Sequence, residues 1–128
     1  MSNNCFVCGK DNPDGMQIDF VLDDNKAYSR FEIEKRFEGW NGIVHGGIIT
    51  TLLDEVMAKA CIASGYEAVT TDIETKFKKS VKVNKNLYLE GKVINRRKKL
   101  LFTEAKIKID DEVYAKANAK FWIKEKIG

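Results

Sequence analysis

The feature that most constrains this chain is one long stretch with the apolar periodicity of a helix, residues 48–64. Apolar side chains recur there at steps of three and four: Ile48, Ile49, Leu52, Leu53, Val56, Met57, Ala60 and Cys61. This spacing places them on one broad stripe, which predicts a long helix that buries that side against other elements. Gly65 directly follows the periodic run and is a natural C-terminal stop, because glycine readily adopts the left-handed conformation that ends helices.

Most of the remaining chain has the pattern of β-strands. Alternating polar and apolar residues, or clusters of β-branched and aromatic residues, occupy residues 16–22, 27–33, 69–77, 87–94, 100–109 and 113–123. Short polar turns join several neighbouring strands. The order of two strands, one helix and four strands predicts an α+β fold, with the helix across one face of an antiparallel sheet. One helix cannot cover both faces of such a sheet, so we expect a homodimer to protect the remaining face or strand edge.

Length and composition indicate one domain, residues 1–128, in which residues 1–15 form a cysteine-containing N-terminal turn segment. An apolar fraction of 44% and a charged fraction of 32% are typical of a soluble globular protein. No apolar run approaches the roughly 20 residues that cross a bilayer, and residues 1–4 lack the pattern of a signal peptide, which favours the cytoplasm. The net charge of +3 allows an anionic ligand, but it does not argue for nucleic acid or a membrane as a partner.

Cys5 and Cys8 form a CxxC motif ahead of the turn-forming residues 11–15. A single CxxC supplies half the ligands of a closed zinc site, and no second pair follows it. We therefore interpret residues 5–9 as a packed N-terminal turn, with metal binding or redox chemistry as the alternative. Three cysteines cannot all pair within one chain, which suits a reducing compartment. The prediction is that the protein has no metal site and no cofactor.

A glycine-dense turn, residues 39–47, leads into the predicted helix and contains the single histidine, His45. A rotation of about 100° per residue places Asp54 nearly beneath Gly47. A carboxylate therefore lies on the order of 10 Å below the helix start. Two interpretations are open at this point: a functional carboxylate, or Asp54 and Glu55 that simply solvate the helix.

Together these residues resemble a known family. The run Gly39-Trp40-Asn41-Gly42-Ile43-Val44-His45-Gly46-Gly47, followed by Thr50-Thr51-Leu52-Leu53-Asp54-Glu55, is similar to the signature of hotdog-fold acyl-CoA thioesterases of the phenylacetate-degradation type. Residues 5–16 resemble the start of one subgroup, and residues 70–79 resemble its strand after the helix. The resemblance implies a hotdog fold, in which one long central helix is wrapped by a curved antiparallel sheet of about six strands.

The resemblance also implies catalytic roles. Asp54 matches the helix acid, which acts as a general base on water or as a nucleophile toward the thioester carbonyl. Gly46 matches the glycine whose backbone N–H polarises the thioester oxygen at the positive end of the helix dipole. At the helix entry, His45 is expected to make a structural or substrate-orienting hydrogen bond rather than to carry catalysis alone, and Glu55 is the fallback acid. The acid and the N–H come from opposite subunits in the family, which implies a catalytic homodimer and, beyond it, a tetramer built as a dimer of dimers.

Substrate-binding roles are implied for a larger set of turn, strand and basic residues: Asn41, Gly47, Thr70, Lys76, Lys78, Arg97, Lys98 and Lys99. Thr70 matches a strand hydroxyl found near the acid. The basic residues match positions that hold the phosphates of CoA, although solvated strand ends are the alternative interpretation. One departure concerns this CoA-binding edge: where the family commonly has a basic residue followed by proline, this chain has Lys79 and Ser80.

The sequence therefore predicts a thioesterase that hydrolyses acyl-CoA to the free carboxylic acid and CoA. A non-catalytic hotdog protein that binds acyl thioesters or another small ligand is the alternative. A CxxC metal module or a nucleic-acid module is a third hypothesis, from a different class. The acyl-chain preference depends on side chains whose orientation does not follow from the sequence.

Overall fold

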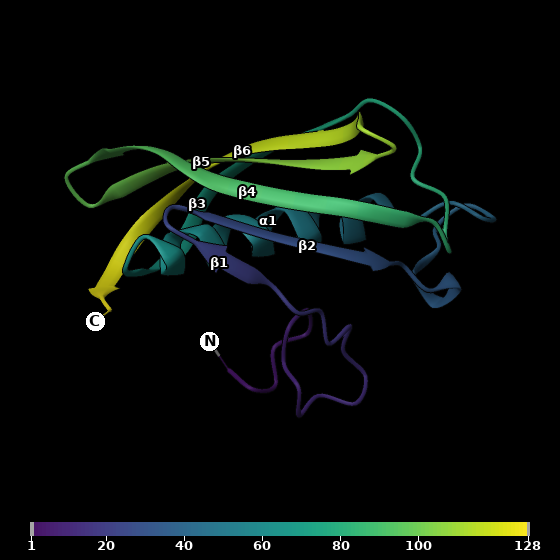
Figure 1. Cartoon of the computed structure of the whole chain (residues 1–128), viewed down its shortest axis with the longest axis horizontal. Coiled ribbons are helices and arrows are strands. Elements are labelled where there is room, and N and C mark those ends of the chain that lie inside the picture. The colour runs from purple at the N-terminus through teal and green to yellow at the C-terminus, as the bar shows by residue number, and fades with distance from the viewer. Residues whose placement is uncertain (1, 128) are drawn as a thin grey trace.

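The computed structural model describes residues 2–127, so residues 1 and 128, the ends of the predicted domain, lie outside the described residues. Within them a long helix, α1 (Gly46–Ala63), lies on the concave side of a six-stranded sheet (Figure 1). The strands are β1 (Val21–Asp23), β2 (Lys26–Glu32), β3 (Tyr66–Phe77), β4 (Asn86–Arg97), β5 (Leu100–Ile109) and β6 (Glu112–Lys126), and a short 3-10 helix, η1 (Lys35–Phe37), precedes α1. The predicted α+β hotdog architecture is confirmed.

The sheet has the strand order β1-β2-β4-β5-β6-β3, and each neighbouring pair is antiparallel. The chain leaves the β1–β2 hairpin, runs through α1 and enters the sheet again at the opposite edge as β3. It then returns to the centre as β4. This crossover carries the helix across the sheet, so that strands far apart in the order contact the same helix.

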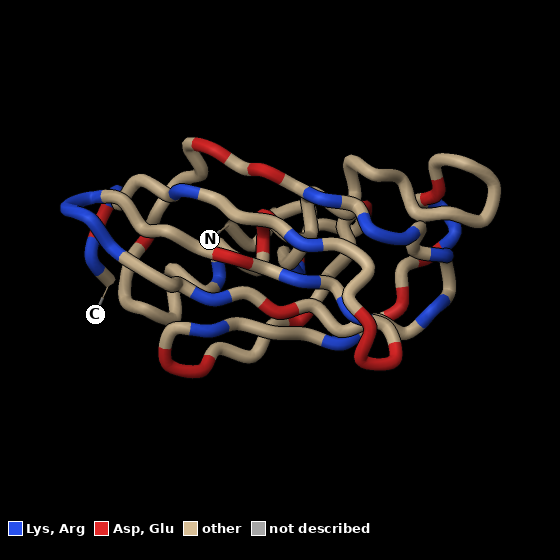
Figure 2. The backbone as a smooth tube through the Cα atoms, turned by 90° about the horizontal axis from the view of Figure 1, so that it is seen from above, with Lys and Arg blue, Asp and Glu red and all other residues tan. Residues whose placement is uncertain are grey.

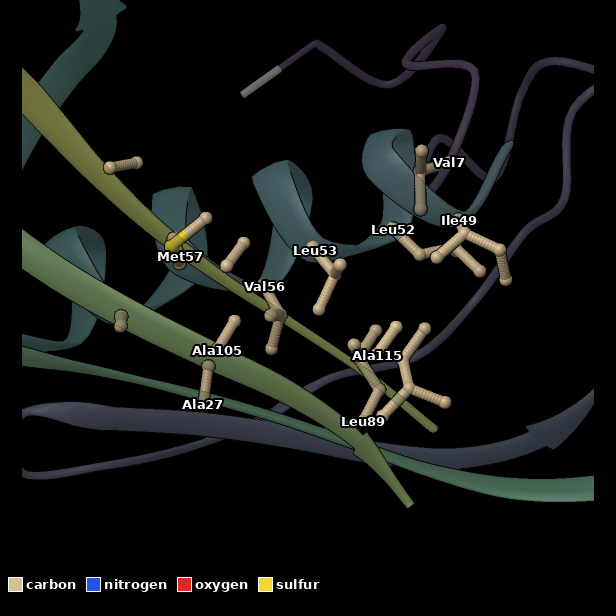
Figure 3. Close-up of a cluster of buried hydrophobic side chains, with 14 of the residues drawn as sticks. Val7, Ala27, Ile49, Leu52, Leu53, Val56, Met57, Leu89, Ala105 and Ala115 are labelled. Carbon is tan, nitrogen blue, oxygen red and sulfur yellow. The ribbon is translucent and has the colours of Figure 1, made fainter. Parts of the chain in front are cut away.

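The core lies between α1 and the concave face of the sheet. Leu52, Leu53, Val56 and Met57 of α1 are fully buried among side chains of the central strands (Figure 3). Gly91 of β4 permits the closest approach, since a Cβ at this position would lie 3.0 Å from both Cγ1 and the carbonyl oxygen of Val56. The predicted apolar stripe is therefore the surface on which the helix rests against the sheet.

The largest difference from the predicted elements is at residues 16–20, which do not form a strand. Gln17 has a φ of 52°. The N–H groups of Met16 and Ile18 donate to the carbonyl oxygens of Phe6 and Val7 rather than to a neighbouring strand. Only two residues of the predicted strand, Val21 and Leu22, pair with β2, and Leu22 is 44% exposed instead of lying on a buried face. The alternation that predicted a strand reflects the packing of an irregular segment.

The N-terminal segment, residues 2–20, packs against the side of α1 that faces away from the sheet. Val7 is 2% exposed and lies near Leu52 and Ile49 of the helix, opposite the strands (Figure 3). The helix is thus covered on two sides, which explains the breadth of its apolar stripe. A third side of the helix faces the edge strand β3.

Candidate active site

The edge strand β3 contains a bulge that decides which of its side chains face the helix. Thr70 pairs with Phe121 and Ile73 pairs with Ala119, which leaves Thr71 as an extra residue. Directly opposed residues of an antiparallel pair point to the same face, and both partners on β6 are buried toward the helix. Thr70 and Ile73 therefore share the helix-facing side, although residues three apart lie on opposite faces of a regular strand.

Asp54 of α1 lies opposite Thr70 of β3, where the helix faces this edge strand. The Thr70 hydroxyl donates a hydrogen bond of 2.6 Å to Oδ1 of Asp54. One turn earlier on the helix, Thr50 and Thr75 are linked by a longer hydroxyl contact of 3.4 Å. The Asp54 carboxylate is partly accessible, so its second oxygen can meet a water molecule or a substrate.

The glycine turn holds His45 as the N-cap of α1. The Gly47 N–H donates a hydrogen bond of 2.8 Å to Nδ1 of His45. Two glycines make room for the imidazole: a Cβ at Gly39 would lie 3.3 Å from Cδ2, and one at Gly47 would lie 3.0 Å from Nδ1. This position supports the predicted structural role for His45. The same hydrogen bond occupies the N–H of Gly47, a residue predicted to bind substrate.

Gly46 is the first residue of α1 and is exposed. A first helical residue has no intrahelical acceptor for its N–H, and the helix dipole makes this end attractive to negative charge. A Cβ built on Gly46 would lie 3.7 Å from the ring of Phe77 at the end of β3. Around it is a pocket of about 290 Å³, lined by Trp40, Ile43, Val44, Gly46, Ile49, Phe77, Lys78, Lys79, Ser80, Val81 and Ala115.

Gly46 and Asp54 lie on one helix but far apart. Eight residues at 1.5 Å each separate them by about 12 Å along the helix axis. A donor must lie about 3 Å from the carbonyl oxygen, and a base must lie about 3 Å from the attacking water. Within one chain, the Gly46 N–H and the Asp54 carboxylate are therefore too distant to act on the same thioester.

The basic residues predicted to bind CoA separate into two groups. Arg97, Lys98 and Lys99 lie at the β4–β5 turn, at one end of the sheet (Figure 2). Lys78 and Lys79 follow the far end of β3 and line the pocket beside Gly46, roughly 35 Å away by the length of that strand.

Two of the basic residues near β3 have other surroundings. Lys76 pairs with Lys116 of β6, so its register directs it to the face of the sheet opposite the helix. Lys79 forms an ion pair with Glu112, and this hydrogen bond raises the pKa of Lys79. Lys78 is therefore the basic residue of the predicted set that lies closest to the helix start. Asn41 lies exposed in the turn before Gly42.

Glu55 faces away from Asp54. It is 9% exposed, and the Cys5 thiol lies 3.7 Å from its Oε2. Burial and a hydrogen bond to Glu55 raise the pKa of Cys8 to about 12. The interpretation that Glu55 solvates the helix is therefore wrong, because its side chain is buried and packs with the CxxC turn on the other side of α1. Its place on that side favours Asp54 over Glu55 as the acid.

Sequence reasoning missed two parts of this arrangement. Phe77 and Trp40 flank the pocket at the helix start, and the 83% exposure of Trp40 is unusual enough to mark a surface of interest. The contact of Glu55 with the cysteines joins residues about 50 positions apart, which no local pattern reveals.

Among the described residues, no helix is long and apolar enough to span a membrane.

Known proteins resemble this chain in sequence and in fold. The profile of the thioesterase superfamily matches residues 41–116. A Streptococcus mutans protein bound to acetyl CoA is 22% identical, with a TM-score of 0.81 over 87% of this chain and 91% of that chain. A protein described as a thioesterase superfamily protein is 23% identical, with a TM-score of 0.88 over 94% of this chain and 60% of that chain. The E. coli PaaI protein of the phenylacetic acid degradation operon is 20% identical, with a TM-score of 0.79 over 86% and 81%. No curated protein sequence gives a significant match.

Proposed function

Because the chain belongs to the thioesterase superfamily, we propose that it hydrolyses an acyl-CoA to the free carboxylic acid and CoA. The observation that carries this proposal is the partly accessible Asp54 carboxylate, which Thr70 orients on the side of α1 that faces the edge strand β3. Superfamily membership supports a thioester hydrolase or a CoA-binding protein in general, and the S. mutans structure with acetyl CoA supports an acyl-CoA as the ligand.

The reaction needs a base and an oxyanion donor. Asp54 removes a proton from a water molecule whose oxygen bonds to the thioester carbonyl carbon, and the carbonyl electron pair moves to oxygen. The Gly46 N–H donates to that oxygen. Collapse of the intermediate restores the carbonyl, the C–S bond breaks with its electron pair on sulfur, and the proton held by Asp54 passes to the thiolate.

A nucleophilic route is the other role proposed for Asp54. Its carboxylate would bond to the carbonyl carbon, expel the CoA thiolate and form an anhydride that water then hydrolyses. A single turnover in ¹⁸O-labelled water tests the nucleophilic route. Label in the Asp54 carboxylate would establish the anhydride, because direct attack by water places the label only in the acid product.

The separation of Gly46 and Asp54 along the helix leads us to propose a site shared by two subunits. β3 is an edge strand whose backbone pairs on one side only among the described strands, and Ile73 and Phe77 of its helix-facing side are 36% and 56% exposed. Phe77 lies beside Gly46 and Thr70 binds Asp54. Antiparallel pairing of two β3 strands, centred between residues 70 and 77, would therefore bring Gly46 of one subunit to Asp54 of the other.

Complementation tests the shared site. Asp54→Asn removes the base, and Gly46→Pro removes the N–H at a helix position that accepts proline; the φ of −57° and ψ of 133° of His45 also suit a residue that precedes proline. A heterodimer of these two chains, isolated with two affinity tags, contains one intact site if the site is shared. We expect it to have about half the wild-type activity per dimer, while each parent homodimer is inactive.

An inactive heterodimer, with both chains folded and dimeric, would place the site within one chain. A monomeric wild-type protein in light scattering would exclude the shared site altogether. The same measurement tests the predicted tetramer: Ile94 and Trp122, exposed by 51% and 45%, are apolar side chains that a second dimer could cover.

We propose that Lys78, at the helix start, and Arg97, Lys98 and Lys99, at the far turn, bind CoA phosphates. Subunits paired through antiparallel β3 strands would bring the far turn of one chain nearer to the pocket of the other. A Lys78→Gln variant and an Arg97→Gln/Lys98→Gln variant should then raise KM for acyl-CoA while kcat changes little. Lys26→Gln is the matched control, because Lys26 lies in β2, beside the opposite edge strand β1.

Hydrolysis of short, long and aromatic acyl-CoAs tests the activity itself. Asp54→Asn, which keeps the shape of the side chain, should lower kcat by about 10²- to 10⁴-fold. Asp110→Asn is the control, because Asp110 is exposed in the β5–β6 turn and its φ of 51° suits asparagine. Binding of acyl-CoA without hydrolysis by the unmutated protein would select the non-catalytic alternative.

A further inference from the structure

The CxxC turn and α1 form a second cluster of reactive groups, on the side of the helix opposite Thr70. The thiol sulfurs of Cys5 and Cys8 and a carboxylate oxygen of Glu55 all lie within 4.8 Å of one another. Cys5 and Cys8 are partly buried and Glu55 is 9% exposed. A carboxylate so well shielded from water beside two thiols is costly unless a cation or hydrogen bonds offset its charge.

We propose that Cys5, Cys8 and Glu55 bind a zinc ion through two thiolates and one carboxylate oxygen. In a tetrahedral site with Zn–S of about 2.3 Å and Zn–O of about 2.1 Å, a sulfur and an oxygen ligand lie about 3.6 Å apart. Cys5 Sγ and Glu55 Oε2 lie 3.7 Å apart. This distance matches the tetrahedral spacing, and all three ligand atoms lie within 4.8 Å of one another. A water molecule would complete the tetrahedron.

The backbone of the turn brings the two sulfurs together. The Gly9 N–H donates a 2.9 Å hydrogen bond to the Cys5 carbonyl, which closes the turn around the pair. A Cβ at Gly9 would lie 2.3 Å from the Cys5 nitrogen and 2.4 Å from the Asn3 oxygen. Only glycine fits there, so the chain has a turn whose close packing fixes both cysteines on the same side.

Lys59, one turn after Glu55 on α1, completes the charge balance. Its ammonium group hydrogen-bonds the Cys8 side chain. Two thiolates and a carboxylate around Zn²⁺ leave one negative charge, which the Lys59 ammonium offsets from outside the ligand set. Thiolate ligands favour zinc over the hard cations Mg²⁺ and Ca²⁺.

The proposed ion would join the N-terminal segment to the helix. Glu55 belongs to α1, whereas both cysteines belong to the irregular segment that covers its outer side. The site is separate from Asp54, which lies on the helix face toward β3, so zinc would fix the position of the segment and is not part of the proposed hydrolysis.

The test uses untagged protein purified under reducing conditions. Elemental analysis should find about one zinc per chain, and cobalt added to the metal-free protein should produce a thiolate-to-cobalt charge-transfer band. Cys5→Ser, Cys8→Ser and Glu55→Gln should each weaken zinc binding by more than the roughly 10- to 100-fold typical of outer partners. Cys61→Ser is the matched control, since Cys61 is buried in the core away from the turn, and it should retain the metal.

Zinc removal gives a readout that does not depend on the variants folding. Limited proteolysis of metal-free wild-type protein should cleave within residues 2–20 faster than in the zinc-loaded protein. A wild-type protein that binds neither zinc nor cobalt would overturn the proposal. A Cys5–Cys8 disulfide in the reduced preparation, or full zinc affinity in both serine variants, would overturn it as well.

Discussion

The Thr70 hydroxyl donates a 2.6 Å hydrogen bond to Oδ1 of Asp54, and this bond joins the middle of α1 to the edge strand β3. It fixes the rotamer of the carboxylate and leaves its second oxygen accessible.

Thr70→Val should lower kcat for the preferred acyl-CoA by about 10- to 100-fold, with KM little changed. A hydrogen bond to a charged group contributes about 1.5–3 kcal/mol, and each 1.4 kcal/mol corresponds to about a factor of ten in rate. Thr70→Ser keeps the hydroxyl and should retain most of the activity. Steady-state kinetics of the two variants check this, and a valine variant with normal kcat would mean that the hydroxyl does not position Asp54 for the reaction.

His45→Ala should lower the free energy of unfolding by about 1 kcal/mol, because the variant loses the N-cap of α1. His45→Asn should restore most of this stability, since asparagine is a favoured N-cap residue. Urea unfolding of the three proteins measures the effect. Activity of the asparagine variant then separates the roles: retained hydrolysis supports capping, whereas complete loss in a stable protein would indicate direct catalysis by His45.

Gly91→Ala should destabilise the protein by about 1–3 kcal/mol through overpacking. The added Cβ would lie 3.0 Å from Cγ1 and from the carbonyl oxygen of Val56, so α1 would have to move away from β4. Combining it with Val56→Ala removes only the contact with Cγ1, so the double variant should recover little of the loss. If the single variant unfolds at the wild-type urea concentration, the helix does not rest on β4 as described.

Cys61 should make stability fall at alkaline pH. It is fully buried, and burial together with the charge of Asp54 raises its pKa from 9.0 to about 12. Below pH 9 the thiol is protonated in both states and has no effect. Between pH 9 and 12 the unfolded chain releases this proton while the folded protein keeps it, so stability falls with rising pH.

Comparison with Cys61→Ala isolates this contribution, because the other titrating groups are common to both proteins. From pH 8 to pH 10.5 the stability of the wild type should decline by about 2 kcal/mol more than that of the variant, at about 1.4 kcal/mol per pH unit above pH 9. Urea unfolding at the two pH values gives the difference. Parallel decline of the two proteins would show that Cys61 ionises in the folded state as readily as in the unfolded one.

Periodicity predicted the helix and five of the six strands closely because their side chains alternate between a buried and an exposed environment. It failed at residues 16–20, where Ile18 is buried but its N–H donates to the carbonyl oxygen of Val7 instead of pairing with a strand. A half-buried strand always shows alternating burial, but an irregular segment can show the same alternation.

The candidate site was predictable only in part, and for a physical reason. Asp54 and Gly46 could be placed on one helix, and their separation follows from its rise. The surroundings of Glu55 could not be predicted in this way, because they depend on the turn at Cys5, which lies 50 positions earlier in the sequence. The partition of the basic residues depends on which end of the sheet each turn occupies, and this is a property of strand order rather than of local sequence.

The bulge at Thr71 makes the number of residues in β3 as important as their identity. A β3 that kept all its residues but lost the bulge would exchange the faces of everything after Thr70, so Ile73 and Phe77 would turn outward while Thr70 stayed beside Asp54. A strand without the extra residue needs no bulge, because Thr70 and Ile73 would then be two apart and would share the helix-facing side. Relatives of this chain that lack the extra residue should therefore carry their apolar side chains one position out of step with it. Aligning such strands by similarity alone would misassign the surface beside the helix start.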